Sequence, residues 1–106
     1  MPNAGWKTAE RTIARRLGGK RTGPSGRAGP DVTSSWLAVE VKTRRRLPAW
    51  LLDALQQARA GCSETRLPLV ILHQVGSRHD GDLVVMSLSS FQEWFGDALP
   101  FANERV

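Results

Sequence analysis

Hydrophobic residues recur at helical spacing in the first part of the chain. Within residues 6–17, Trp6, Ile13 and Leu17 fall on one stripe, which predicts an amphipathic helix. Glu10 lies on the same stripe, because it follows Trp6 by four residues and precedes Ile13 by three. Its side chain is therefore predicted to face inward, although a charged residue on a helix usually points to solvent.

The spacing changes to alternation in two short segments, residues 31–34 and 36–43, which predict two strands joined as a hairpin. In the second strand, alternate apolar side chains share one face, while Glu40 and Lys42 share the other. Their Cα atoms would be about 6.5–7 Å apart along the strand. A closed hairpin would bring both beside Asp31, so two acids and a lysine are expected to lie together.

Four further segments complete the expected order of elements. The pattern predicts a helix, two strands and a final helix over residues 47–61, 67–75, 83–88 and 89–99. The first of these strands is a continuous apolar run, which is typical of a central strand covered on both faces. The order α-β-β-α-β-β-α indicates an α/β fold.

Glycine marks the least regular part of the sequence. Residues 18–29 hold five of the ten glycines, which predicts either a flexible loop or a distorted edge strand. No linker is long enough to divide the chain. We therefore expect a single domain over residues 1–106, with frayed ends at 1–5 and 102–106.

The composition fits one soluble globular domain, with 41% hydrophobic and 24% charged residues among 106. No apolar run approaches the roughly 20 residues of a membrane span, and the first residues lack the apolar stretch of a signal peptide. The single cysteine, Cys62, excludes an internal disulfide and suits a reducing compartment. We therefore expect a cytoplasmic protein without a membrane partner.

Positive charge is concentrated in residues 1–46, where eleven basic and three acidic residues give a balance of +8. The other sixty residues hold four basic and seven acidic side chains, a balance of −3. A segment this basic predicts a polyanionic partner, most simply nucleic acid. Its acids, Glu10, Asp31 and Glu40, would repel phosphate unless a divalent cation lay between them. The alternative is that they pair with nearby arginines.

These acids lie in a pattern that resembles a known family. Pro30-Asp31, a gap of eight residues and Glu40-Val41-Lys42 resemble the signature of PD-(D/E)xK nucleases. Glu10, on the preceding helix, is similar to the glutamate of the archaeal and bacteriophage Holliday junction resolvases in that superfamily. The resemblance implies a restriction-endonuclease-like core, in which helices flank a central mixed β-sheet.

The resemblance also implies a metal-dependent endonuclease with defined roles for these residues. Asp31 and Glu40 would bind Mg²⁺, or Mn²⁺ in its place, together with the backbone carbonyl of Val41. Glu10 would complete the site directly or through water. Lys42 would position and polarise the attacking water and stabilise the developing negative charge. The alternative for Lys42 is a plain salt bridge to Glu40.

Family members often carry a polar residue on the helix that follows the lysine. Gln57 is the candidate here, as a hydrogen-bonding partner of the attacking water or of the phosphate. Gln56 is equivalent to it by periodicity, and the alternative for both is a solvated side chain.

The two histidines are not predicted to bind zinc. The spacing of His73 and His79 fits neither a strand pair nor one face of a helix, and Cys62 is distant in sequence. We expect His73 to end a strand and His79 to lie in a turn.

The resemblance implies that the substrate is branched DNA, namely a four-way (Holliday) junction. Nothing resembles a base-reading helix, so DNA structure is expected to be recognised more than DNA sequence. Two matched cuts need two sites, so a homodimer is expected, with Trp36, Trp50, Trp94 and Phe95 either in its interface or in the core. The expected phosphate contacts are Lys7, Arg11, Arg15, Lys20, Arg21, Arg27, Arg44, Arg45 and Arg46.

The similarity to small bacteriophage-encoded resolvases implies a phage protein that acts in the host cytoplasm. Two alternatives remain open. One is a nuclease of the same fold that cuts flaps, forks or duplex DNA. The other is a catalytically silent DNA-binding module.

Overall fold

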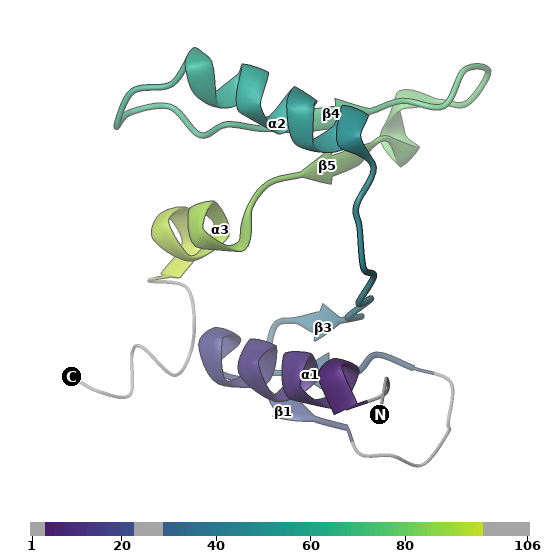
Figure 1. Cartoon of the computed structure of the whole chain (residues 1–106), viewed down its shortest axis with the longest axis vertical. Helices are drawn as coiled ribbons and strands as arrows, with labels where there is room; N and C mark the ends of the chain where they lie inside the picture. Colours follow the sequence, from purple (N-terminus) through teal and green to yellow (C-terminus); the bar gives the residue numbers. More distant parts are fainter. Residues whose placement is uncertain (1–3, 23–28, 97–106) are drawn as a thin grey trace. The chain divides into compact units, whose positions relative to one another are not determined.

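The computed structural model describes residues 4–22 and 29–96 and shows an α/β protein (Figure 1). Within these residues, three α-helices accompany two antiparallel sheets, one of three strands and one of two. The elements are α1 (Ala4–Leu17), β1 (Lys20–Arg21), β2 (Val32–Thr33), β3 (Ala38–Val39), α2 (Ala49–Ala60), β4 (Val70–Leu72), the 3-10 helix η1 (His79–Gly81), β5 (Leu83–Val85) and α3 (Leu88–Phe95).

The order of helices and strands agrees with the one expected from the pattern. β1 adds the edge strand that was one of two alternatives for the glycine-rich segment, of which residues 23–28 lie outside the described residues. The predicted frayed ends also lie outside them, apart from residues 4–5, which begin α1. In the described ranges, every helix is too short or too polar to cross a membrane.

The chain divides into two compact units. One comprises Met1–Arg45 with Phe95–Val106, and the other comprises Arg46–Trp94. The described strands pair in two separate antiparallel sheets. They establish the general α/β class, whereas the predicted central mixed sheet stays a prediction.

In the first unit, α1 ends at two glycines. The N–H of Gly18 donates to the carbonyl of Arg15 at 3.5 Å, and that of Gly19 donates to Ala14 at 2.8 Å. This pair of bonds is the Schellman motif, which needs a residue in the left-handed region. Gly18 supplies it with φ at 69°. The chain therefore leaves the helix abruptly and enters β1.

One face of α1 packs on the three-stranded sheet (Figure 1). Glu10, Ala14 and Leu17 are buried on this face. Of the predicted stripe, Glu10 and Leu17 are thus buried, Ile13 is half-buried, and Trp6 at its start is exposed. The side chain of Val32, on the central strand β2, is 1% exposed. This small apolar layer is the core of the first unit in the described residues.

The predicted hairpin is present, but its strands are shorter than expected. β2 and β3 pair in an antiparallel sense, with Val32 opposite Val39. The turn is closed by Ser34, whose N–H donates to the carbonyl of Leu37 at 3.0 Å and whose Oγ accepts the N–H of Leu37 at 3.2 Å. Such a side-chain bond is a common way to stabilise a tight turn.

The second unit contains the β4–β5 hairpin and α2, which contacts β4. Burial alternates along β4, since Val70 and Leu72 are half-buried and Ile71 is exposed. The prediction that this strand is covered on both faces is therefore wrong in the described residues. Helix α2 can cover only one face of the β4–β5 sheet, and Ile71 points to the other face.

Gly19 should not tolerate a side chain. A Cβ at this position would lie 2.6 Å from the carbonyl oxygen of Thr33 and 3.0 Å from Cγ1 of Val32. Gly19→Ala must therefore push the end of α1 away from β2. We expect the free energy of unfolding, measured by urea denaturation, to fall by about 1–3 kcal/mol, as for other overpacked positions.

Gly5→Ala is the matched control, because a Cβ at that position would meet nothing within 4 Å apart from its chain neighbours and the backbone of α1 itself. It should leave the free energy of unfolding unchanged or raise it by up to about 1 kcal/mol, since alanine favours helix. Equal stability of the two variants would contradict the close approach at Gly19.

Candidate functional site

Asp31 ends the β2–β3 ladder and joins the two segments of the predicted signature. Its N–H donates to the carbonyl of Val39 at 2.8 Å, and its Oδ2 accepts the N–H of Val41 at 2.8 Å. Pro30 has no N–H with which to extend the ladder, and its carbonyl accepts the hydroxyl of Thr22 at 2.7 Å. A side-chain carboxylate therefore takes the bond that a backbone carbonyl would take in a longer strand.

Glu40 and Lys42 follow β3 and lie next to each other, as the alternation predicts. Lys42 Nζ is 2.9 Å from Glu40 Oε2, and the two side chains are 65% and 49% exposed. Val41 between them is half-buried, so the alternation continues beyond the two-residue strand. Its carbonyl, predicted as a metal ligand, keeps that role as a prediction. The ion pair matches the salt-bridge alternative for Lys42, and an exposed pair contributes at most about 1 kcal/mol.

Glu10 faces inward, as predicted, and is 8% exposed. Its Oε1 accepts a hydrogen bond from Nε of Arg21 at 3.0 Å. The guanidinium suits a shielded pair because it is planar and more weakly hydrated than an ammonium group. This bond links α1 to β1. In the sheet, Arg21 of β1 pairs with Val32 of β2, the residue that follows Asp31. Glu10 on α1 is therefore tied to the sheet that contains the hairpin.

The three acids of the basic segment are thus compensated one by one. Glu10 meets Arg21, Glu40 meets Lys42, and Asp31 accepts a backbone N–H. In the part of the chain that the structure describes, they do not form a group placed to share one metal ion. A site that contains all three would hold the cation beside the Arg21 guanidinium, which is bonded to Glu10 Oε1. The shared Mg²⁺ site stays a prediction.

Gln57, the candidate partner of the attacking water, lies on α2 in the second unit. It is exposed, as is its neighbour Gln56. The exposure does not distinguish the two glutamines, so the role of Gln57 stays a prediction.

Most of the predicted phosphate contacts are exposed side chains on α1, on β1 and after β3. They are Lys7, Arg11, Arg15, Lys20, Arg44, Arg45 and Arg46. Arg21 differs from them, because it is half-buried and bonds to Glu10. Arg27 lies outside the described residues.

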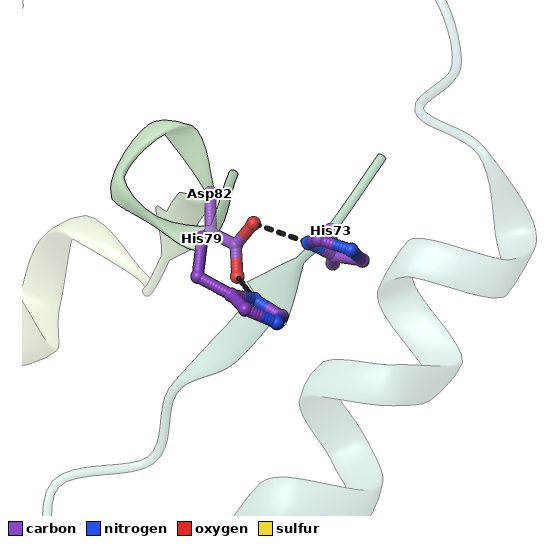
Figure 2. A group of neighbouring side chains, drawn as sticks. All are labelled: His73, His79 and Asp82. Atoms are coloured by element: carbon purple, nitrogen blue, oxygen red, sulfur yellow. Dashed lines mark hydrogen bonds and ion pairs between the residues drawn. The ribbon is translucent and has the colours of Figure 1, made fainter. Parts of the chain in front are cut away.

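The second unit contains a group that sequence reasoning missed (Figure 2). The Nδ1 atoms of His73 and His79 lie 2.6 and 2.9 Å from the two carboxylate oxygens of Asp82. His73 follows β4 and His79 begins η1, so their predicted strand-end and turn positions are confirmed. The two side chains meet at Asp82, although their spacing in the sequence fits neither a strand pair nor one face of a helix. The missed signal is the hairpin register, in which Leu72 pairs with Leu83 and so sets His73 opposite Asp82.

No known protein family, characterised protein or solved structure matches this chain. The candidate sites therefore stand on their own geometry.

Arg21→Met should destabilise the first unit, because it leaves the Glu10 carboxylate shielded from water without its partner. We expect the free energy of unfolding to fall by about 2–3 kcal/mol, somewhat less than for a fully buried pair. Urea denaturation followed by circular dichroism measures this change. Lys20→Met, at the exposed neighbouring position of β1, should stay within about 0.5 kcal/mol of the wild type.

Adding Glu10→Gln to Arg21→Met should recover part of the loss, since the uncompensated charge is then removed. If Arg21→Met and Lys20→Met unfolded at the same urea concentration, the Glu10–Arg21 pair would not contribute to the free energy of unfolding.

Proposed function

We propose that this chain is a metal-dependent endonuclease that hydrolyses phosphodiester bonds in branched DNA, with the four-way junction as its substrate. The observation that carries the proposal is the 2.8 Å hydrogen bond between Asp31 Oδ2 and the Val41 N–H. It holds Pro30-Asp31 against Glu40-Val41-Lys42, the juxtaposition that the resemblance to PD-(D/E)xK nucleases implies. A restriction-endonuclease-like core is part of the same proposal.

The donor atoms of this hairpin suit Mg²⁺. The carboxylates of Asp31 and Glu40 and the carbonyl of Val41 offer oxygen, which Mg²⁺ and Mn²⁺ prefer. Bound there, the ion would supply an activated water molecule and would neutralise charge on the phosphate. The Val41 N–H orients the Asp31 carboxylate, whose second oxygen has lone pairs of its own for a ligand.

The other candidate residues differ in how easily they can reach the phosphate, the water molecule or the metal ion. The Lys42 ammonium is largely exposed beside Glu40, so it can turn to a phosphate oxygen or a water molecule at little cost. Glu10 is shielded and bound to Arg21, so the proposal gives it a supporting role, directly or through water. Gln57 would hydrogen-bond to the attacking water or to the phosphate.

Recognition of DNA by its structure is supported by the kind of contact that exposed basic residues can make. Lysine and arginine on phosphates supply affinity and position but read no base sequence. A four-way junction has two-fold symmetry, so a homodimer would provide the two matched cuts. Trp36, Trp50, Trp94 and Phe95 are each 38–60% exposed and are candidates for its interface.

A second candidate function is a DNA-binding module without catalysis. The observation in its favour is that Glu10 and Glu40 already have cationic partners in the protein itself. In such a module the acids would maintain the fold of the basic unit, and no metal would be needed.

Asp31→Asn should abolish Mg²⁺-dependent cutting of a labelled four-way junction and leave DNA binding intact or tighter. The amide oxygen of asparagine can still accept the Val41 N–H, so the hairpin is retained while the negative charge is lost. Glu40→Gln should behave in the same way. Gel analysis with Mg²⁺, with Ca²⁺ and with chelator measures cutting, and fluorescence anisotropy measures binding.

Asp53→Asn is the control, because it makes the same chemical change at an exposed position of α2. Linear duplex, a flap and a single strand test the substrate class. Cutting by Asp31→Asn at the wild-type rate would show that the metal site is misassigned. Tight binding without cutting by the wild type, with any of these metals, would favour the module.

Replacing Arg44, Arg45 and Arg46 with alanine should reduce the salt dependence of binding to the four-way junction. If each arginine contacts one phosphate, the slope of log K against log salt should fall by about 2–3. Anisotropy titrations at several NaCl concentrations give this slope. Arg78→Ala is the control, since Arg78 is 91% exposed in the second unit, near Asp80. Equal slopes for the triple variant and the wild type would show that residues 44–46 do not contact the DNA phosphates.

A further inference from the structure

The β4–β5 hairpin carries two imidazoles and one carboxylate at the end where its strands are joined. Leu72 of β4 pairs with Leu83 of β5, so the next position of the register sets His73 opposite Asp82. His73 Nδ1 and Asp82 Oδ1 are 2.6 Å apart. The antiparallel ladder therefore sets two members of the group opposite each other, just after β4 and just before β5.

The third member comes from the turn. η1 begins at His79, and the N–H of Asp82 donates to the carbonyl of His79 at 2.9 Å. This bond brings His79 Nδ1 to 2.9 Å from Asp82 Oδ2. The imidazoles of His73 and His79 stack with centroids 4.1 Å apart and planes 26° apart. Figure 2 shows the carboxylate of Asp82 directed at both rings.

From this geometry we infer that His73, His79 and Asp82 bind a divalent transition-metal ion of the zinc type. Their ligand atoms lie within 4.8 Å of one another. Zinc bonds of about 2.0–2.2 Å in tetrahedral geometry separate neighbouring ligand atoms by about 3.4 Å. The distances of 2.6 and 2.9 Å must therefore open by less than an ångström as the ion replaces the imidazole protons.

The side chains differ in their freedom to make this adjustment. Asp82 is 14% exposed and lies between η1 and β5, whereas His79 is 82% exposed. Asp82 and the partly shielded His73 would form the fixed side of the site, and His79 would close on the ion.

The ligand types select the metal. Two imidazole nitrogens and one carboxylate oxygen suit Zn²⁺, Co²⁺, Ni²⁺ or Cu²⁺, whereas Mg²⁺ prefers oxygen ligands throughout. Structural zinc sites usually have four protein ligands, and three leave a position for water or another small ligand. This site is separate in chemistry and in residues from the Mg²⁺ site of the proposed nuclease.

Titration of the full, chelator-treated chain with Zn²⁺ in a calorimeter tests the inference. We expect one ion per chain, and Co²⁺ should give visible absorption bands of a low-coordinate site. His79→Ala should weaken binding by at least about 100-fold, since changes in residues that merely support a metal ligand already cost up to that much. The high exposure of His79 makes this variant compatible with the fold, which circular dichroism checks.

Asp80→Asn is the matched control, because Asp80 lies in the same turn but is 91% exposed and outside the group. It should bind Zn²⁺ as the wild type does, and so should Asp31→Asn. No binding by the wild type, or undiminished binding by His79→Ala, would overturn the inference. Loss of binding in Asp31→Asn would also overturn it, because the ion would then lie at the other carboxylates. None of these results depends on whether the chain cuts DNA.

Discussion

The hydrogen bond between the Val41 N–H and Asp31 Oδ2 is the contact on which the first hairpin and the candidate active site both depend. The backbone ladder cannot extend through Pro30, and a shielded N–H without a partner costs about 1–3 kcal/mol. The carboxylate removes that cost, so the chain beyond β3 keeps its alternation and directs Glu40 and Lys42 outward. One side chain therefore shapes the fold and places the candidate chemistry.

The structure could be predicted from the sequence where it depends on interactions between residues close together in the chain. Helical spacing predicted α1 and the inward position of Glu10, and alternation predicted the hairpin and the contact of Glu40 with Lys42. Apart from the pairing of β2 with β3, these features need only the period of a single element. The exact strand lengths were less accessible, because Asp31 replaces a backbone acceptor with its side chain, which no periodicity reveals.

The remaining features depend on pairings between distant residues. Arg21 could have faced a phosphate or an acid, and only the packing of β1 on α1 brings it to Glu10. The meeting of His73 with Asp82 requires the register of β4 and β5, and that register depends on where the turn begins. The exposure of Ile71 follows from the number of layers around its strand, which an apolar run does not specify.

The two ion pairs of the first unit have almost the same length, 3.0 Å for Glu10–Arg21 and 2.9 Å for Glu40–Lys42, but not the same surroundings. Dissolved ions screen exposed charges over about 8 Å at physiological ionic strength, and they screen shielded pairs much less. Rising salt therefore loosens Glu40 while Glu10 stays bound. The burial of each carboxylate, and not the length of its ion pair, therefore decides how readily it can leave its partner for an incoming cation.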